Sequence, residues 1–103
     1  MFKLAAVLAL VASPALSAGL EIDIAGEANG TIVIDLFEET APLHVAQITA
    51  IAAAGNYDGV VFHRVIDGFM AQTGDVANGN MEKDFNLRLA GTGGSDKPNL
   101  KAE

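Results

Sequence analysis

Residues 57–75 read YDGVVFHRVIDGFMAQTGD, and the interpretation of the whole chain starts from this stretch. Its first part, 60–66, is rich in β-branched and aromatic side chains, which is typical of a β-strand. Gly59, Gly68 and Gly74 mark turns before and after it, because glycine accepts backbone conformations that other residues avoid. The stretch therefore predicts a short strand bounded by tight turns, with the large apolar pair Phe69-Met70 beside the second turn.

Arg64 stands out within the predicted strand. Regular alternation places one set of side chains on one face and a second set on the other: Phe62, Arg64 and Ile66 against Val61, His63 and Val65. Arg64 is therefore expected among apolar neighbours, where its charged guanidinium group needs a hydrogen-bond acceptor or has a functional role. The residues alone leave two interpretations open, a snorkelling or salt-bridged arginine and a catalytic one.

The motifs within this stretch also resemble those of a known family. FHRVI at 62–66, GFM at 68–70, then Gln72 and GD at 74–75 closely resemble the signature of the cyclophilins, the peptidyl-prolyl cis-trans isomerases. The similarity extends over about residues 20–100. Two turn positions depart from the family pattern, since the cyclophilins commonly have proline where Asp67 stands and glycine where Thr73 stands.

The resemblance implies a fold and a reaction. The fold is a mainly β, antiparallel eight-stranded barrel closed by helices, of which residues 19–103 are expected to form about the first half. The reaction is rotation about X-Pro bonds in protein folding, with proline-containing polypeptides as partners and no cofactor. A non-catalytic module that binds proline peptides, or an inactive fragment of the isomerase, is the alternative.

The resemblance also assigns the site residues. Arg64 is the catalytic residue, which stabilises the twisted amide. Phe69 and Met70 form the apolar wall that receives the proline ring, although without the resemblance both fit a simple core equally well. Gln72 holds the substrate backbone, and His63 with Phe62 supports the floor.

Composition excludes several functions. With 13 acidic and 6 basic side chains the net charge is −7, which argues against nucleic acid or an anionic membrane as partner. The absence of cysteine excludes disulfides, thiol catalysis and cysteine-based zinc sites. With only His44 and His63, no metal site is expected. The glycine-rich 91–94 lacks a following lysine and a helix start, so a phosphate loop is not favoured.

Residues 1–18 have the pattern of a secretory signal peptide. Lys3 supplies the positive charge, 4–16 is an apolar run, and small residues at 15–18 suit a signal peptidase. The run is short for a membrane span, which needs ~20 apolar residues. We therefore expect cleavage, a periplasmic or secreted protein without a stable membrane anchor, and a partial isomerase domain over 19–103.

The remaining pattern predicts further elements around the central stretch. Apolar and acidic residues alternate over 20–24, which is typical of a half-exposed strand. A second strand is predicted over 32–37, where Ile32, Ile34 and Leu36 alternate with Val33, Asp35 and Phe37, and the turn at 26–30 joins the two strands as a hairpin. A helix of about four turns is predicted over 40–54, with Thr40 as N-cap, Pro42 in the first turn and Gly55 after its end. Alternating apolar residues within 81–90 give a weak strand signal.

Overall fold

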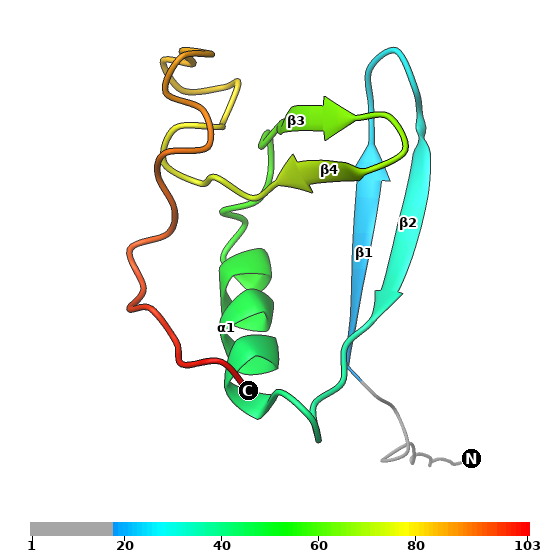
Figure 1. Cartoon of the computed structure of the whole chain (residues 1–103), viewed down its shortest axis with the longest axis vertical. Coiled ribbons are helices and arrows are strands. Elements are labelled where there is room, and N and C mark those ends of the chain that lie inside the picture. The colour runs from blue at the N-terminus through cyan, green and yellow to red at the C-terminus, as the bar shows by residue number, and fades with distance from the viewer. Residues whose placement is uncertain (1–17) are drawn as a thin grey trace, which may run out of the picture. The chain divides into compact units, whose positions relative to one another are not determined.

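The computed structural model describes residues 18–103, so the predicted signal segment lies, apart from Ala18, outside the described residues. The elements are β1 (Gly19–Ile24), β2 (Gly30–Asp35), α1 (Pro42–Ala53), β3 (Phe62–Ile66) and β4 (Met70–Thr73) (Figure 1). The strands form two antiparallel two-stranded sheets, β1–β2 and β3–β4. This confirms the prediction of a mainly β, antiparallel fold. Of the described residues, 18–46 with Glu103 form one compact unit and 47–102 the other.

The β1–β2 hairpin has the predicted partners in a regular register. Ile22 lies opposite Ile32 and Leu20 opposite Ile34, so one face is apolar. On the other face, the Thr31 hydroxyl donates to the Asp23 carboxylate at 2.9 Å. β2 ends at Asp35, two residues earlier than predicted, because the chain turns there toward the helix.

Helix α1 begins later than predicted and spans 12 residues, a little over three turns. Pro42 occupies the first helical position, where its missing N–H is not needed. The prediction of Thr40 as N-cap is wrong: the Ala41 carbonyl accepts the first helical bond, from the Val45 N–H. The free N–H groups of Leu43 and His44 donate instead to the Glu103 carboxylate, at 3.0 and 2.8 Å.

Gly55 follows the end of α1 with φ +78°, a left-handed conformation that favours glycine and that confirms the predicted stop. The chain then turns into the second hairpin. β3 is shorter than the predicted strand, because Val60 pairs only with Asn80 in an isolated bridge. β4 was not predicted at all. It forms because the turn at 67–69 folds the chain back onto β3, with Ile66 opposite Met70.

Apart from the bridge at Asn80, the segment after Thr73 consists of turns, bends and irregular stretches. The weak strand signal within 81–90 is wrong, since no residue of this range is in a strand, and Leu87 and Leu89 are exposed. The buried side chains among residues 18–103 are few: Val45 and Ile51 on α1, and the polar Asp75 and Asn80. No helix within this described range has the length and apolar character that crossing a membrane requires.

Candidate functional site

A β-bulge at His63 determines which side chains share a face of the β3–β4 hairpin. Phe62 lies opposite Thr73 and Arg64 opposite Gln72, so two steps along β3 match one step along β4. Directly opposite residues of an antiparallel pair point to the same side, and successive residues alternate. Arg64 and Phe62 therefore lie on opposite faces. The prediction that they share one is wrong, because strict alternation does not survive an inserted residue.

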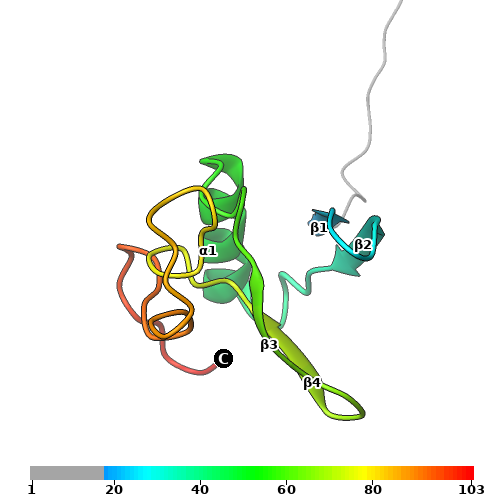
Figure 2. The same cartoon turned by 90° about the horizontal axis from the view of Figure 1, so that it is seen from above.

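Beyond the bulge the register is regular and builds a mixed polar and apolar surface. Arg64 pairs with Gln72, and Ile66 pairs with Met70 two residues further on. These residues, Arg64, Ile66, Met70 and Gln72, form what we call the Arg64 face. Figure 2 shows β3 and β4 as a twisted ribbon closed by its turn. Of the six residues singled out from the sequence, three thus come together on one face: Arg64, Met70 and Gln72.

The turn at 67–69 closes the far end of this hairpin. The Phe69 N–H donates to the Ile66 carbonyl at 3.0 Å, and Gly68 has φ +75°, which favours glycine. Phe69 is 74% exposed, whereas Met70 is half-buried. The turn therefore leaves a whole aromatic ring accessible at the end of the Arg64 face.

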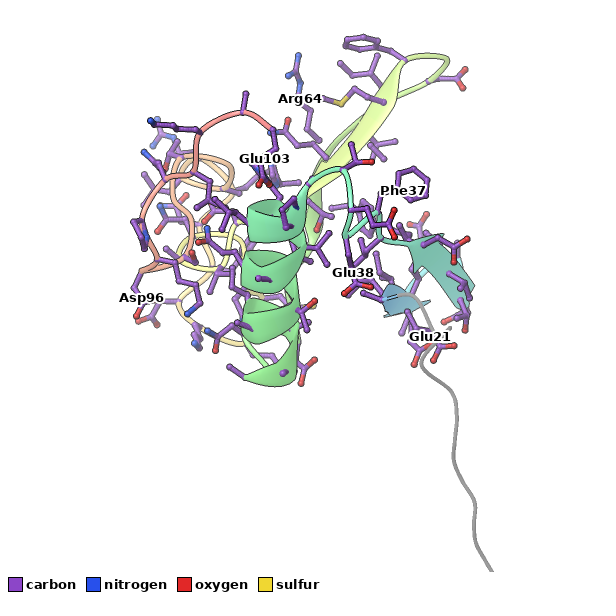
Figure 3. The ribbon with its side chains drawn as sticks, turned by 90° about the horizontal axis from the view of Figure 1, so that it is seen from below. Glu21, Phe37, Glu38, Arg64, Asp96 and Glu103 are labelled. Carbon is purple, nitrogen blue, oxygen red and sulfur yellow. The ribbon has the colours of Figure 1, made fainter. Side chains whose placement is uncertain are left out.

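Arg64 is exposed, and its side chain extends away from the hairpin (Figure 3). The ion pair found among residues 18–103 joins His44 to Glu103, so Arg64 has no carboxylate partner within that range. This does not support the salt-bridged interpretation of Arg64. Its five donors are available to a ligand.

Phe62 lies on the face opposite Arg64, and His63 is the residue inserted at the bulge. Both are half-buried. The His63 Nδ1 atom is buried without a hydrogen-bond partner among the described residues. Its ring lies against the backbone of Gly91, where an added Cβ would come within 2.8 Å of Nε2 and 2.9 Å of Cδ2. His63 is thus held by packing at the bulge next to Arg64.

Asp75 is a residue of this region that sequence reasoning left without a role. It is 4% exposed, and its carboxylate accepts four backbone N–H groups. Oδ1 accepts from Ala77 at 3.1 Å and Asn78 at 2.9 Å. Oδ2 accepts from Gly91 at 2.7 Å and Gly93 at 2.9 Å. The glycine-rich loop 91–94 therefore does bind an anion, and the anion is the chain's own carboxylate.

The charge of Asp75 is stabilised by these donors. Burial by itself raises the pKa of a carboxyl group, but the N–H groups of Asn78, Gly93, Gly91 and Ala77 together hold the pKa of Asp75 below its ordinary value. The bonds from Ala77 and Asn78 could be expected from the sequence, because an Asp side chain commonly accepts the N–H groups two and three residues further on. The other half joins residues 16 and 18 positions apart, which no local pattern specifies.

The Arg64 face combines hydrogen-bond donors with apolar side chains. Guanidinium and amide groups next to Ile66, Met70 and Phe69 suit an extended polypeptide that presents carbonyl oxygens and an apolar side chain. Within residues 18–103 no three His, Asp or Glu side chains gather as metal ligands. Fold and site thus describe an antiparallel β protein whose second hairpin presents donors and apolar side chains on one face.

Comparison with known proteins places the chain in a family. Residues 20–101 match the family described as cyclophilin type peptidyl-prolyl cis-trans isomerase/CLD. The chain belongs to this family, which confirms the resemblance carried by 62–75. The family is an enzyme class, that of the peptidyl-prolyl cis-trans isomerases.

Curated relatives agree with this assignment. A probable peptidyl-prolyl cis-trans isomerase of Brucella suis biovar 1 (strain 1330) is 55% identical over 75 residues, 73% of this chain and 38% of the relative. Its counterpart in Brucella abortus (strain 2308) is 53% identical over the same share of each chain. A peptidyl-prolyl cis-trans isomerase of Synechococcus elongatus is 49% identical over 46 residues, 45% of this chain and 32% of the relative. The chain thus spans less than half the length of these relatives, and no solved structure matches it.

Proposed function

We propose that this protein is a peptidyl-prolyl cis-trans isomerase that accelerates rotation about X-Pro bonds in protein folding. The observation that carries the proposal is the pairing of exposed Arg64 with Gln72 on a face that also holds Ile66 and Met70. Family membership over residues 20–101 supports the same activity.

The proposed reaction needs no bond to be made or broken. Rotation of an X-Pro amide requires loss of its resonance, a barrier of ~18–20 kcal/mol. Twisting localises the lone pair on the prolyl nitrogen, which then becomes a better hydrogen-bond acceptor. The guanidinium of Arg64 donates to that nitrogen and so binds the twisted amide more tightly than the planar one. A donor that the bound substrate encloses in a site closed to water contributes about 3 kcal/mol, roughly a hundredfold in rate.

The neighbouring residues hold the substrate. Phe69 and Met70 form the apolar wall for the proline ring, which fits the exposure of Phe69 at the end of the Arg64 face. The Gln72 amide hydrogen-bonds the substrate backbone, because it lies directly opposite Arg64. His63 and Phe62 support the hairpin from beneath the bulge.

The substrates we propose are proline-containing polypeptides outside the cytoplasm. The basis is the sequence of residues 1–18, which combines a positive start, an apolar run and small residues at its end. Removal of this segment on export would leave a periplasmic or secreted protein.

Exchange spectroscopy on a short Ala-Pro peptide tests the proposed activity. The cis and trans forms give separate NMR signals, and uncatalysed exchange takes tens of seconds or longer. An isomerase brings cross-peaks between the two forms at substoichiometric protein concentrations. Line broadening of the peptide without exchange cross-peaks contradicts the proposal and identifies a non-catalytic binding module. Neither broadening nor exchange identifies an inactive fragment.

A further inference from the structure

The end of β3 next to Arg64 is fixed by contacts that lie outside the hairpin. The hairpin has two registers: the turn sets one, with Ile66 opposite Met70, and Phe62 opposite Thr73 belongs to the other. The two registers differ by one residue, and His63 absorbs the difference. A bulge of this kind changes the local twist and the direction of the neighbouring side chain, here Arg64.

One set of these contacts is a chain of hydrogen bonds that begins at Asp75. The Asp75 carbonyl accepts the Gly79 N–H at 2.9 Å, and the Gly79 carbonyl accepts the Val61 N–H at 2.8 Å. The Val61 carbonyl in turn accepts the Thr73 hydroxyl at 2.8 Å. Val61 is therefore held from both sides immediately before β3 starts.

The second set runs through the Asp75 side chain. Its Oδ2 atom accepts the N–H groups of Gly91 and Gly93, and these bonds fix the loop 91–93. Gly91 has φ +94° and leaves no room for a Cβ, because the His63 ring occupies that space. Gly93 is equally enclosed, since a Cβ there would lie 2.9 Å from Ala77 Cβ and from Asp75 Oδ1. The loop is thus packed between Asp75 and His63.

The position of the His63 ring depends on this packing. Its Nδ1 atom is buried without a hydrogen bond among residues 18–103, so no directional bond at that atom locates the ring. The ring position rests on its neighbours, and Gly91 supplies one wall. A displaced loop would therefore release His63 and allow β3 to take a regular register, with His63 in place of Phe62 opposite Thr73.

We propose that Asp75 is a positioning residue for Arg64. Its carboxylate fixes the loop 91–93, the loop holds His63 in the bulge, and the bulge sets the direction in which Arg64 leaves β3. The role of Arg64 itself rests on the proposed function, but the control of the bulge by Asp75 does not.

The test uses two variants of the full chain and two matched controls. Asp75→Asn removes the charge and one acceptor, and Asp96→Asn makes the same change at an exposed aspartate. Gly91→Ala places a methyl group against His63, whereas at Gly94 a Cβ would meet nothing within 4 Å. Gly94→Ala is therefore the control for Gly91→Ala, which also covers the case in which Asp75→Asn fails to fold.

Two readouts separate this inference from the proposed function. The first is the register, measured by cross-strand nuclear Overhauser effects. We expect the Phe62–Thr73 contact to be replaced by His63–Thr73 in both variants, with Ile66–Met70 kept and both controls like wild type. The second is turnover, where a misplaced Arg64 should lower kcat about 10- to 100-fold with peptide Kd within about threefold.

Each outcome decides the inference. An unchanged register in a folded Asp75→Asn or in Gly91→Ala, or a changed register with wild-type kcat, overturns it. A fall in kcat without a register change also overturns it, because the loss then has another origin. If wild-type protein is inactive, the proposed function fails, and the register readout alone decides whether Asp75 controls the bulge.

Discussion

Asp75→Asn is the substitution for which the structure gives the clearest expected magnitude. The wild-type carboxylate accepts four backbone N–H groups at 2.7–3.1 Å, two at each oxygen. Asparagine keeps one oxygen and replaces the other by an NH2 group. That group faces two N–H donors, and turning the amide over only moves the mismatch from Gly91 and Gly93 to Ala77 and Asn78.

The expected loss follows from the two missing bonds. A hydrogen bond to a charged group contributes about 1.5–3 kcal/mol, so two of them correspond to about 3–6 kcal/mol of unfolding free energy. Small domains have only about 5–15 kcal/mol in total. Asp75→Asn should therefore lower the urea midpoint strongly, whereas Asp96→Asn should change the free energy by less than about 0.5 kcal/mol.

The assay is urea unfolding followed by circular dichroism, together with hydrogen exchange of the Gly91 and Gly93 amides.

The depressed pKa of Asp75 adds a dependence of the stability on pH. The unfolded chain takes up the proton first, so the contribution of Asp75 is complete above about pH 4 and is lost as pH falls through its lower folded pKa. The difference between wild type and Asp75→Asn should shrink in that range. Equal stability of the two proteins at pH 7, or a difference that stays constant below pH 4, would refute the reasoning.

Three further predictions concern other parts of the chain. Asn80→Ala should lower the unfolding free energy by about 2 kcal/mol or more, because the buried Asn80 side chain donates to the Asp58 carbonyl and accepts the Glu82 N–H. A loss below about 0.5 kcal/mol in urea titrations would contradict this. Gly68→Ala should cost about 1–2 kcal/mol from its φ of +75° alone, since a Cβ there meets nothing; a variant as stable as Gly94→Ala would contradict this. Mass spectrometry of the protein from its native host should find a chain that starts near residue 19, and a retained Met1 would contradict export by cleavage.

The parts of the fold that local patterns specify were predictable. Alternation in 20–24 and 32–37 with a glycine-containing turn between them gave the β1–β2 hairpin. Pro42 and Gly55 marked the first turn and the stop of α1, but the Glu103 cap could not be predicted, because it comes from a residue about 60 positions away.

The candidate site was predictable only in part, for the same physical reason. FHRVI predicted a strand, and the family signature singled out Arg64 and Gln72, which the structure places opposite each other. The bulge at His63 reverses the face of Phe62 and has no signal in the period of the strand, since it depends on distant contacts with 79 and 91. The strand predicted within 81–90 did not form, because a segment with alternating apolar residues needs a second strand to pair with before it can form a sheet.

The most direct test of the central claim is the turnover of Arg64→Ala, measured beside peptide affinity on the same proline substrate. If the guanidinium acts on the twisted amide, kcat should fall about a hundredfold, while peptide Kd should stay within a few-fold of wild type. Arg64→Lys should lose nearly as much, because lysine keeps the charge without the planar donor group. An Arg64→Ala protein that keeps its kcat, or loses only affinity, would contradict the role of Arg64 as the catalytic residue.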